Sequence, residues 1–224
     1  MDPKKMYHTT ITCPVCDQPF AATKLRYGVY RVSDQDSDFA LNCEGVNPIL
    51  YDIWVCPNCG YAAFQENFAE ISAKDKKIIA TEISSHWQTK DYSGERTLDA
   101  ALETFKLALY GSQLRKAKSS EIAKTCLRIA WLYRWKADPR ETEFLTFAAE
   151  YYSDAYQYED FPLDRLDEPH CLYLIAELYR RAGNVEEAAR WFGTFFNNRQ
   201  ARENRSLADM ARDQYQLVKN LKQD

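Results

Sequence analysis

The chain has 224 residues, 46% of them hydrophobic, and a formal net charge of −4 at pH 7. This is enough apolar content for a packed core in one large domain or two small ones. Residues 1–12 lack the apolar run of a signal peptide, and no stretch approaches the roughly 20 apolar residues of a membrane helix. Seven cysteines, an odd number, are typical of a reducing compartment and not of a disulfide framework. We therefore predict a cytoplasmic protein with no membrane contact.

The first elements along the chain surround two Cys-Pro-x-Cys motifs. Each motif bends the backbone so that both of its sulfurs can reach one ion at about 2.3 Å. Together, Cys13, Cys16, Cys56 and Cys59 supply the four thiolates of a closed tetrahedral zinc site. We predict that these four residues bind Zn²⁺ as a structural metal.

The residues around the motifs indicate β structure. Asp17 and Gly60 follow the last cysteine of each motif, where a left-handed backbone is often required. Partial alternation over residues 24–32 and a period of two over residues 49–55 predict strands, the second of which leads into Cys56. A strand that leads into each motif is the zinc-ribbon arrangement, so we predict a zinc-ribbon-like module over residues 1–64.

Between the motifs lies a loop with three alternating aspartates: Asp34, Asp36 and Asp38. It is not an EF-hand loop, because Phe39 stands at the sixth position, where glycine is required. We predict a solvated acidic loop that pairs with Arg26 or Arg31. A contact with a hard metal ion or a partner is the alternative.

From about residue 72 onward the hydrophobic period becomes 3.6. It predicts seven helices, at residues 73–88, 96–110, 120–136, 139–156, 169–182, 185–197 and 203–221. Ser72, Asp138 and Asn184 are predicted to cap helix N-termini, and Gly183 is predicted to end a helix.

Small and aromatic residues recur at fixed spacing in these helices. From Ala176, the spacings to Tyr179, Ala188 and Phe192 match the tetratricopeptide helix-turn-helix signature. The second-helix spacing occurs twice more, at Ala101, Phe105 and Ala108, and at Ala148, Tyr152 and Ala155. We predict a mainly α protein, with tetratricopeptide-like helical hairpin repeats over residues 65–224 and the small β module before them. A generic helical bundle is the alternative.

No motif of a catalytic site is present. His8, His86 and His170 lie in no ligand or triad spacing, and no phosphate-binding glycine loop occurs. Cys126 and Cys171 fall on apolar helix faces, where we expect them to be buried. We therefore predict no catalytic residues and no cofactor besides zinc.

The segment of residues 47–63, the first cysteine motif and residues 36–39 together resemble a bacterial family of unknown function. Its members have an N-terminal segment with two such cysteine motifs, followed by tetratricopeptide-like helices. The resemblance implies a bacterial cytoplasmic protein of no assigned activity. From this resemblance, only the four motif cysteines are assigned a role in this chain, as metal ligands.

These observations favour a non-enzymatic, zinc-binding adaptor whose helical domain binds a protein or peptide partner. Two alternatives stay open: a thiol-based redox sensor or oxidoreductase that uses the cysteine pairs, and nucleic-acid binding through the ribbon. The first sixty residues hold five basic and seven acidic side chains, a balance that does not favour phosphate binding. A homo-oligomer is also compatible with the sequence.

Overall fold

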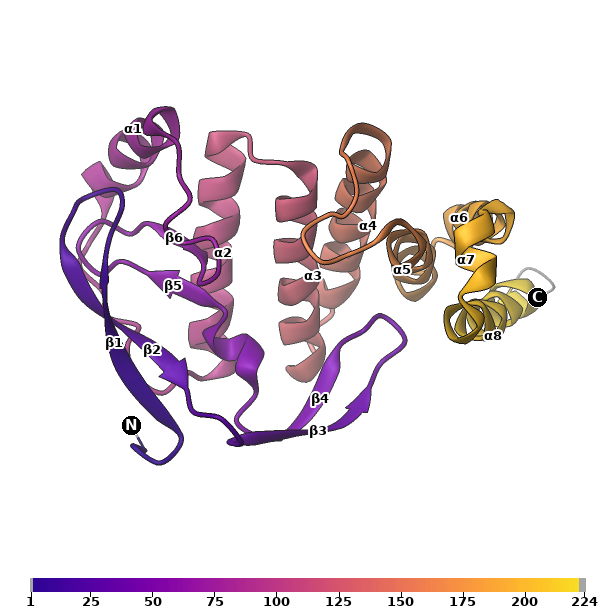
Figure 1. The fold of residues 1–224 in the computed structure, drawn as a ribbon, viewed down its shortest axis with the longest axis horizontal. Coiled ribbons are helices and arrows are strands. Elements are labelled where there is room, and N and C mark those ends of the chain that lie inside the picture. The colour runs from indigo at the N-terminus through magenta and orange to yellow at the C-terminus, as the bar shows by residue number, and fades with distance from the viewer. Residues whose placement is uncertain (1, 222–224) are drawn as a thin grey trace. The chain divides into compact units, whose positions relative to one another are not determined.

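A computed structural model describes residues 2–221 (Figure 1). The chain forms two compact units. Unit 1 contains the residues up to Gln35 together with Leu41–Ala117, and unit 2 contains Asp36–Ala40 together with the residues from Lys118 onward. The boundary expected after residue 64 stays a prediction. The structure is mainly helical, with small antiparallel β hairpins near the N-terminus.

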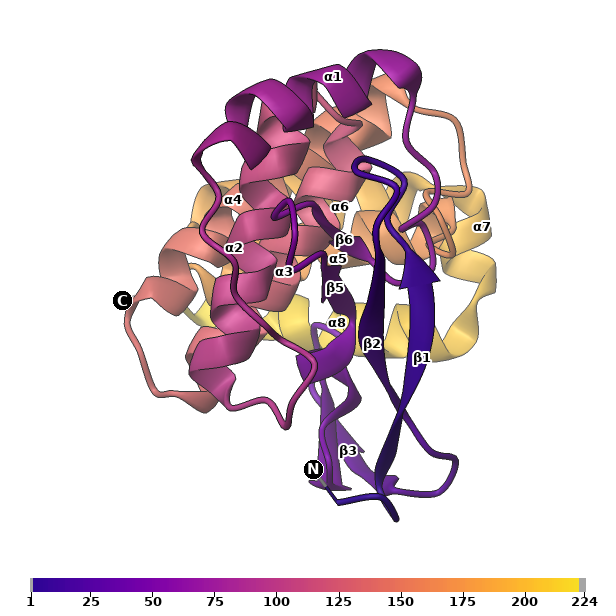
Figure 2. The same cartoon turned by 90° about the vertical axis from the view of Figure 1, so that its left-hand side faces the viewer.

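Unit 1 contains three antiparallel strand pairs (Figure 2). These are β1 (Met6–Thr12) with β2 (Pro19–Leu25), β3 (Tyr30–Gln35) with β4 (Leu41–Gly45), and β5 (Ile53–Val55) with β6 (Ala62–Phe64). The first and last pairs are hairpins whose turns are the two cysteine motifs. A strand therefore leads into each motif and another leaves it, while the assignment of a zinc ribbon stays a prediction.

Both predicted strands between the motifs need correction. Residues 24–32 do not form one strand, because the chain turns between β2 and β3, where Gly28 has a φ of +78°. Residues 49–55 begin as a short 3-10 helix, Pro48–Tyr51, and only Ile53–Val55 is extended. The side chain of Asn47 accepts a hydrogen bond from the Ile49 amide at 3.1 Å, and Pro48 needs no partner for an amide hydrogen. These two local signals outweigh the alternating pattern.

Two helices complete unit 1: α1 (Ala73–Glu82) and α2 (Leu98–Arg115). The Ser72 side chain accepts from the Asp75 amide at 3.1 Å, which confirms the predicted N-cap of α1. This helix is shorter than predicted, because a 3-10 turn, Ser84–His86, replaces its last turns. In contrast, α2 continues five residues beyond its predicted end and stops where Lys116 takes a φ of +51°.

Unit 2 contains six helices within its described residues. They are α3 (Ser119–Trp135), α4 (Arg140–Tyr158), α5 (Glu168–Arg181), α6 (Val185–Asn197), α7 (Arg199–Glu203) and α8 (Arg205–Leu221). Consecutive helices from α3 to α6 pack against each other, and α8 packs against α5 and α6. The caps at Asn184 and Gly183 are confirmed, the latter with a φ of +82°. The single helix predicted at residues 203–221 starts later, because Asn204 caps α8.

The alanines of the predicted repeat pattern lie in the core. Ala101, Ala148, Ala155, Ala176 and Ala188 are all fully buried. Small side chains at these positions let paired helices approach closely. The assignment of the helices to tetratricopeptide-like repeats stays a prediction.

The prediction of a solvated acidic loop was wrong for two of its three aspartates. Asp38 is 0% exposed, and its carboxylate binds the Arg134 guanidinium through two hydrogen bonds, of 3.0 and 2.5 Å. Asp36 accepts a further bond from Arg134 at 2.6 Å. The partner is therefore neither Arg26 nor Arg31. A carboxylate can be buried here because a guanidinium from the same unit compensates its charge. Asp34 lies on β3 and is exposed.

Candidate metal centre

The two cysteine motifs have matching backbone geometry. The amide of Asp17 donates to the Cys13 carbonyl, and the amide of Gly60 donates to the Cys56 carbonyl, both at 2.9 Å. Asp17 and Gly60 have φ values of +55° and +74°, as their positions after the motifs predict. This left-handed residue closes each turn, so that both cysteine side chains of a motif point to the same side.

The fold brings the four sulfurs together from the two hairpins. The Sγ atoms of Cys13 and Cys59 lie 3.6 Å apart, and those of Cys16 and Cys56 lie 3.7 Å apart. All four lie within 4.8 Å of one another. Sulfurs at about 2.3 Å from a tetrahedral ion would be separated by about 3.8 Å, which is close to the distances of the two nearest pairs. The four cysteines can therefore hold one metal ion.

The thiols cannot all ionise in this arrangement without a cation. Hydrogen bonding with Cys56 raises the pKa of Cys13 to about 12, and the same interaction lowers the pKa of Cys56 to about 2. Hydrogen bonding to Cys13 and Cys56 also raises the pKa of Cys59. The charge of any one thiolate in this cluster opposes the ionisation of its neighbours. A divalent cation would offset part of the charge of four thiolates and favour their ionisation, so binding would release protons.

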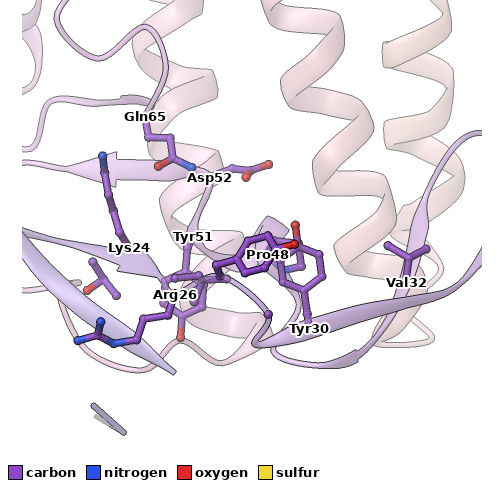
Figure 3. A pocket seen from close by; sticks show the side chains of 12 residues that line it. Lys24, Arg26, Tyr30, Val32, Pro48, Tyr51, Asp52 and Gln65 are labelled. Atoms are coloured by element: carbon purple, nitrogen blue, oxygen red, sulfur yellow. The ribbon is translucent and has the colours of Figure 1, made fainter. Parts of the chain in front are cut away.

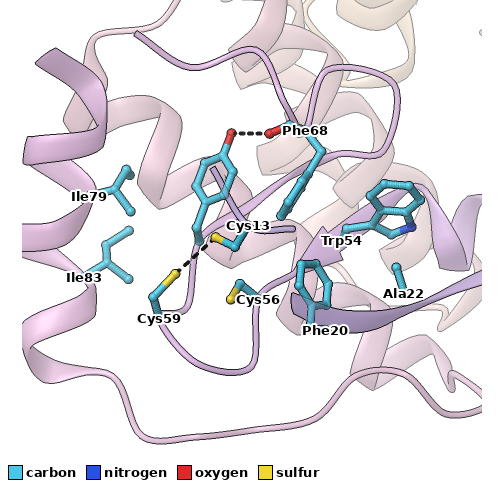
Figure 4. Packing of buried hydrophobic residues seen from close by; sticks show 10 residues of the cluster. Cys13, Phe20, Ala22, Trp54, Cys56, Cys59, Phe68, Ile79 and Ile83 are labelled. Carbon is cyan, nitrogen blue, oxygen red and sulfur yellow. Dashed lines mark hydrogen bonds between the residues drawn. The ribbon is translucent and has the colours of Figure 1, made fainter. Parts of the chain in front are cut away.

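Apolar side chains cover the sulfurs (Figure 4). The Phe68 ring is central: its centroid lies 5.6 Å from that of Phe20, 5.7 Å from Trp54 and 4.9 Å from Tyr61. The Tyr61 hydroxyl donates to the Phe68 carbonyl at 3.2 Å, which holds the segment over the site. Three of the cysteines are buried, and Cys16 is partly exposed. With four protein ligands and this cover, a bound ion would have no open position for a substrate, as in structural zinc sites.

Two residues that support the site were missed in the sequence. The Ser84 hydroxyl donates to the Cys59 carbonyl at 2.9 Å, and the Trp87 indole donates to the Pro57 carbonyl at 2.8 Å. A Cβ on Gly60 would lie 2.5 Å from the Trp87 ring, so this position requires glycine for space as well as for its backbone. Both residues are more than twenty positions from the motif, so no local sequence pattern predicts their contacts with it.

The other residues singled out in the sequence do not join this centre. Within residues 2–221, the four cysteines are the only group of three or more potential ligands that lie close enough together to hold an ion. Cys126 and Cys171 are buried, as predicted, and burial raises the pKa of Cys126 to about 12. His170 Nδ1 lies 2.6 Å from an Asp167 carboxylate oxygen, an interaction within one helical turn.

Fold and site together define a mainly helical protein with a four-cysteine centre that can hold a metal ion. The family described as "Uncharacterized protein conserved in bacteria (DUF2225)" matches residues 6–218, and the chain belongs to this family. It is also 26% identical over 169 residues to an uncharacterized protein of Borreliella burgdorferi. That alignment covers 66% of this chain and 61% of the relative, so the chain spans less than two thirds of the relative's length.

No solved structure matches the chain. In the described part of the chain, no helix is long and apolar enough to cross a membrane.

Proposed function

We propose that this protein is a non-enzymatic cytoplasmic adaptor, in which zinc stabilises the β hairpins and tetratricopeptide-like helices bind a peptide segment of a partner. Zinc is the metal that four cysteines in a tetrahedral arrangement suit best, because Zn²⁺ accepts four thiolates without a redox change. Three two-stranded sheets bury little apolar surface by themselves, so a metal would contribute to their folding free energy. None of the seven cysteines is in a disulfide, which supports a reducing compartment.

The observation that carries the binding proposal is the way unit 2 holds its own Asp36–Ala40 segment. The Tyr173 hydroxyl of α5 donates to the Ser37 carbonyl at 2.8 Å, a contact any peptide backbone can make. The Asp38 carboxylate also accepts from the Trp131 indole of α3 at 3.0 Å. The Phe39 ring contacts Tyr173, with centroids 5.4 Å apart. Backbone, carboxylate and aromatic ring are thus each recognised by helical side chains.

These contacts define the chemistry of the proposed partner. Arg134 and Arg181 face the Asp38 carboxylate, with Arg181 Nε at 3.7 Å. The Ser37 hydroxyl donates to the buried Glu177 carboxylate at 2.5 Å. A partner segment that carries an acidic residue followed by an aromatic one would make the same contacts. It would compete with Asp36–Ala40, so the internal segment would lower the partner's apparent affinity.

The metal part of the proposal is tested by the zinc content and the thiol reactivity of protein purified under reducing conditions. We expect one zinc per chain and four thiols that react only after chelation or denaturation. Metal-free protein with two or more fast-reacting thiols would contradict structural zinc and favour the redox alternative.

The binding part is tested with a fluorescein-labelled peptide of residues 33–42, titrated with the full zinc-loaded chain. In the double variant Asp38→Asn/Phe39→Ala, the internal segment is weakened, and we expect tighter peptide binding than in the unmodified chain. Adding Arg134→Gln to the double variant should abolish this increase in peptide affinity. A peptide with asparagine in place of its aspartates is the matched control. Equal binding of both peptides, or no gain in the double variant, would refute the proposed site.

A further inference from the structure

Unit 1 contains an open hollow of about 660 Å³ (Figure 3). It lies at the ends of β2 and β5 that are farthest along each strand from the cysteine turns. Its lining comes from the end of β2, the turn before β3, β3 itself and the 3-10 helix at Pro48–Tyr51. The lining includes two basic residues, Lys24 and Arg26, and three tyrosines, Tyr27, Tyr30 and Tyr51. Basic and aromatic side chains therefore meet at one place, although they alternate with other residues in the sequence.

The two basic side chains of the hollow are Lys24 and Arg26, and each contacts an aromatic ring. Lys24 Nζ lies 5.3 Å from the Trp54 ring centroid, and the Arg26 guanidinium lies 5.3 Å from that of Tyr7. Arg26 Nε donates to a backbone carbonyl, that of Pro3, at 2.9 Å. Within the described residues neither cation forms an ion pair. Asp52 is the one acidic residue in the lining.

A third positive charge is buried behind this wall. Arg96 is 7% exposed. Its guanidinium donates to the carbonyls of Leu50 at 3.0 Å and Ile53 at 2.7 Å. These two residues flank Tyr51 and Asp52, which line the hollow. Burial lowers the pKa of Arg96 to about 10, so it remains charged at neutral pH. No ion pair compensates it in the part of the chain that the structure describes. A buried charge is weakly screened, so Arg96 adds to the positive charges of Lys24 and Arg26, against the single Asp52 carboxylate of the lining, which also interacts with Arg96.

Aromatic rings at this end of the unit are unusually exposed. Tyr27 is fully exposed at the turn, and Tyr30 and Tyr7 are 40% and 39% exposed. Rings left in water beside unpaired cations suit a ligand that has both planar groups and negative charges. Nucleotides combine these two features, since their bases stack on aromatic rings and their phosphates bind Lys and Arg.

We propose that this hollow binds single-stranded nucleic acid, with phosphates at Lys24 and Arg26 and bases stacked on Tyr27 and Tyr30. The openness of the hollow favours a strand that passes through it over a free nucleotide, which proteins usually enclose. A duplex does not offer its base faces for stacking. This activity is independent of peptide binding by unit 2.

The test is fluorescence anisotropy of a labelled twelve-residue oligothymidylate with the full zinc-loaded chain, at several salt concentrations. Two phosphate contacts predict a slope of about −1.4 for the logarithm of the binding constant against the logarithm of salt concentration. Lys24→Gln should reduce this slope by about 0.7. Tyr27→Ala or Tyr30→Ala should each weaken binding by about 5- to 150-fold, the loss of one stacked base.

Matched controls lie in the same unit but outside the hollow. Arg31→Gln removes a basic residue of β3, and Tyr110→Ala removes an exposed tyrosine of α2. Both should bind the oligonucleotide like the unmodified chain, and unchanged zinc content would verify folding in every variant. The proposal is overturned if no saturable binding occurs, or if the controls lose as much affinity as the hollow variants. It is also overturned if thymidine monophosphate competes as well, per nucleotide, as the strand.

Discussion

Asp38 offers the sharpest test of how unit 2 is held together. Asp38→Asn keeps the shape of the side chain but removes the charge that faces Arg134, whose side chain is only 15% exposed. Breaking a buried ion pair costs about 3–5 kcal/mol, because the remaining charge is left desolvated. Arg134 would keep Asp36 and Glu141, each at 2.6 Å, so we expect the lower end, about 3 kcal/mol. For a chain of this size that corresponds to a fall in Tm of about 6–12 °C.

The effect should depend on pH with a defined sign. Burial alone would raise the pKa of Asp38, but the hydrogen bonds and charge of Arg134 outweigh it and lower this pKa. A carboxyl with a depressed folded pKa stabilises the protein above its unfolded pKa of about 3.9, and this contribution is lost as the pH falls through the folded value. The difference between Asp38→Asn and the unmodified chain should therefore be full at pH 7 and shrink below about pH 4.

Thermal unfolding followed by circular dichroism would measure both effects. Asp209→Asn is the control, because Asp209 pairs with Arg212 on the exposed surface of α8, where a pair contributes little. We expect no measurable change in Tm for that variant. If Asp38→Asn unfolds within error of Asp209→Asn at pH 7, then the buried pair does not stabilise unit 2 as argued.

Three further changes test unit 1. Cys56→Ser should abolish stoichiometric metal binding, as measured by metal analysis after gel filtration. Gly60→Ala should weaken zinc affinity about 10- to 100-fold in competition with a chromogenic chelator, because its Cβ would displace the supporting Trp87 ring. Gly94→Ala, where a Cβ would meet no atom within 4 Å, should leave that affinity unchanged. Arg96→Met should reduce the free energy of unfolding in urea by about 1–3 kcal/mol, since it leaves buried carbonyls without donors. A stable Arg96→Met protein would contradict the role given to those bonds.

Features that depend on neighbouring residues could be predicted from the sequence. The cysteine turns needed only the Cys-Pro-x-Cys spacing and a following residue that accepts a left-handed backbone. Helix starts at Ser72 and Asn184 were predicted because a cap acts within one turn. The strand predicted over residues 49–55 failed at its start for the same kind of reason, since a local Asn-Pro signal competed with the alternation.

Features that depend on partners far along the chain were missed. Asp38 lies in an acidic loop, and no neighbouring residue predicts its ion pair with Arg134, which is almost one hundred residues away. The charge count over sixty residues was balanced, yet folding gathers Lys24 and Arg26 at one hollow and adds the buried Arg96. The charge count of a segment cannot show that basic side chains cluster in space, because the clustering depends on which strand ends lie together in the fold.

The sequence by itself thus determined the four candidate metal ligands, the change from β structure near the N-terminus to helices after it, and the burial of the small helical residues. These properties follow from short-range geometry and hydrophobic periodicity. Only the tertiary structure decided that the four sulfurs are close enough to share one ion, that Trp87 supports them, and that the Asp36–Ala40 segment belongs to the helical unit. The physical reason is that buried charges and supporting side chains are selected by what surrounds them in space, and those surroundings come from distant parts of the chain.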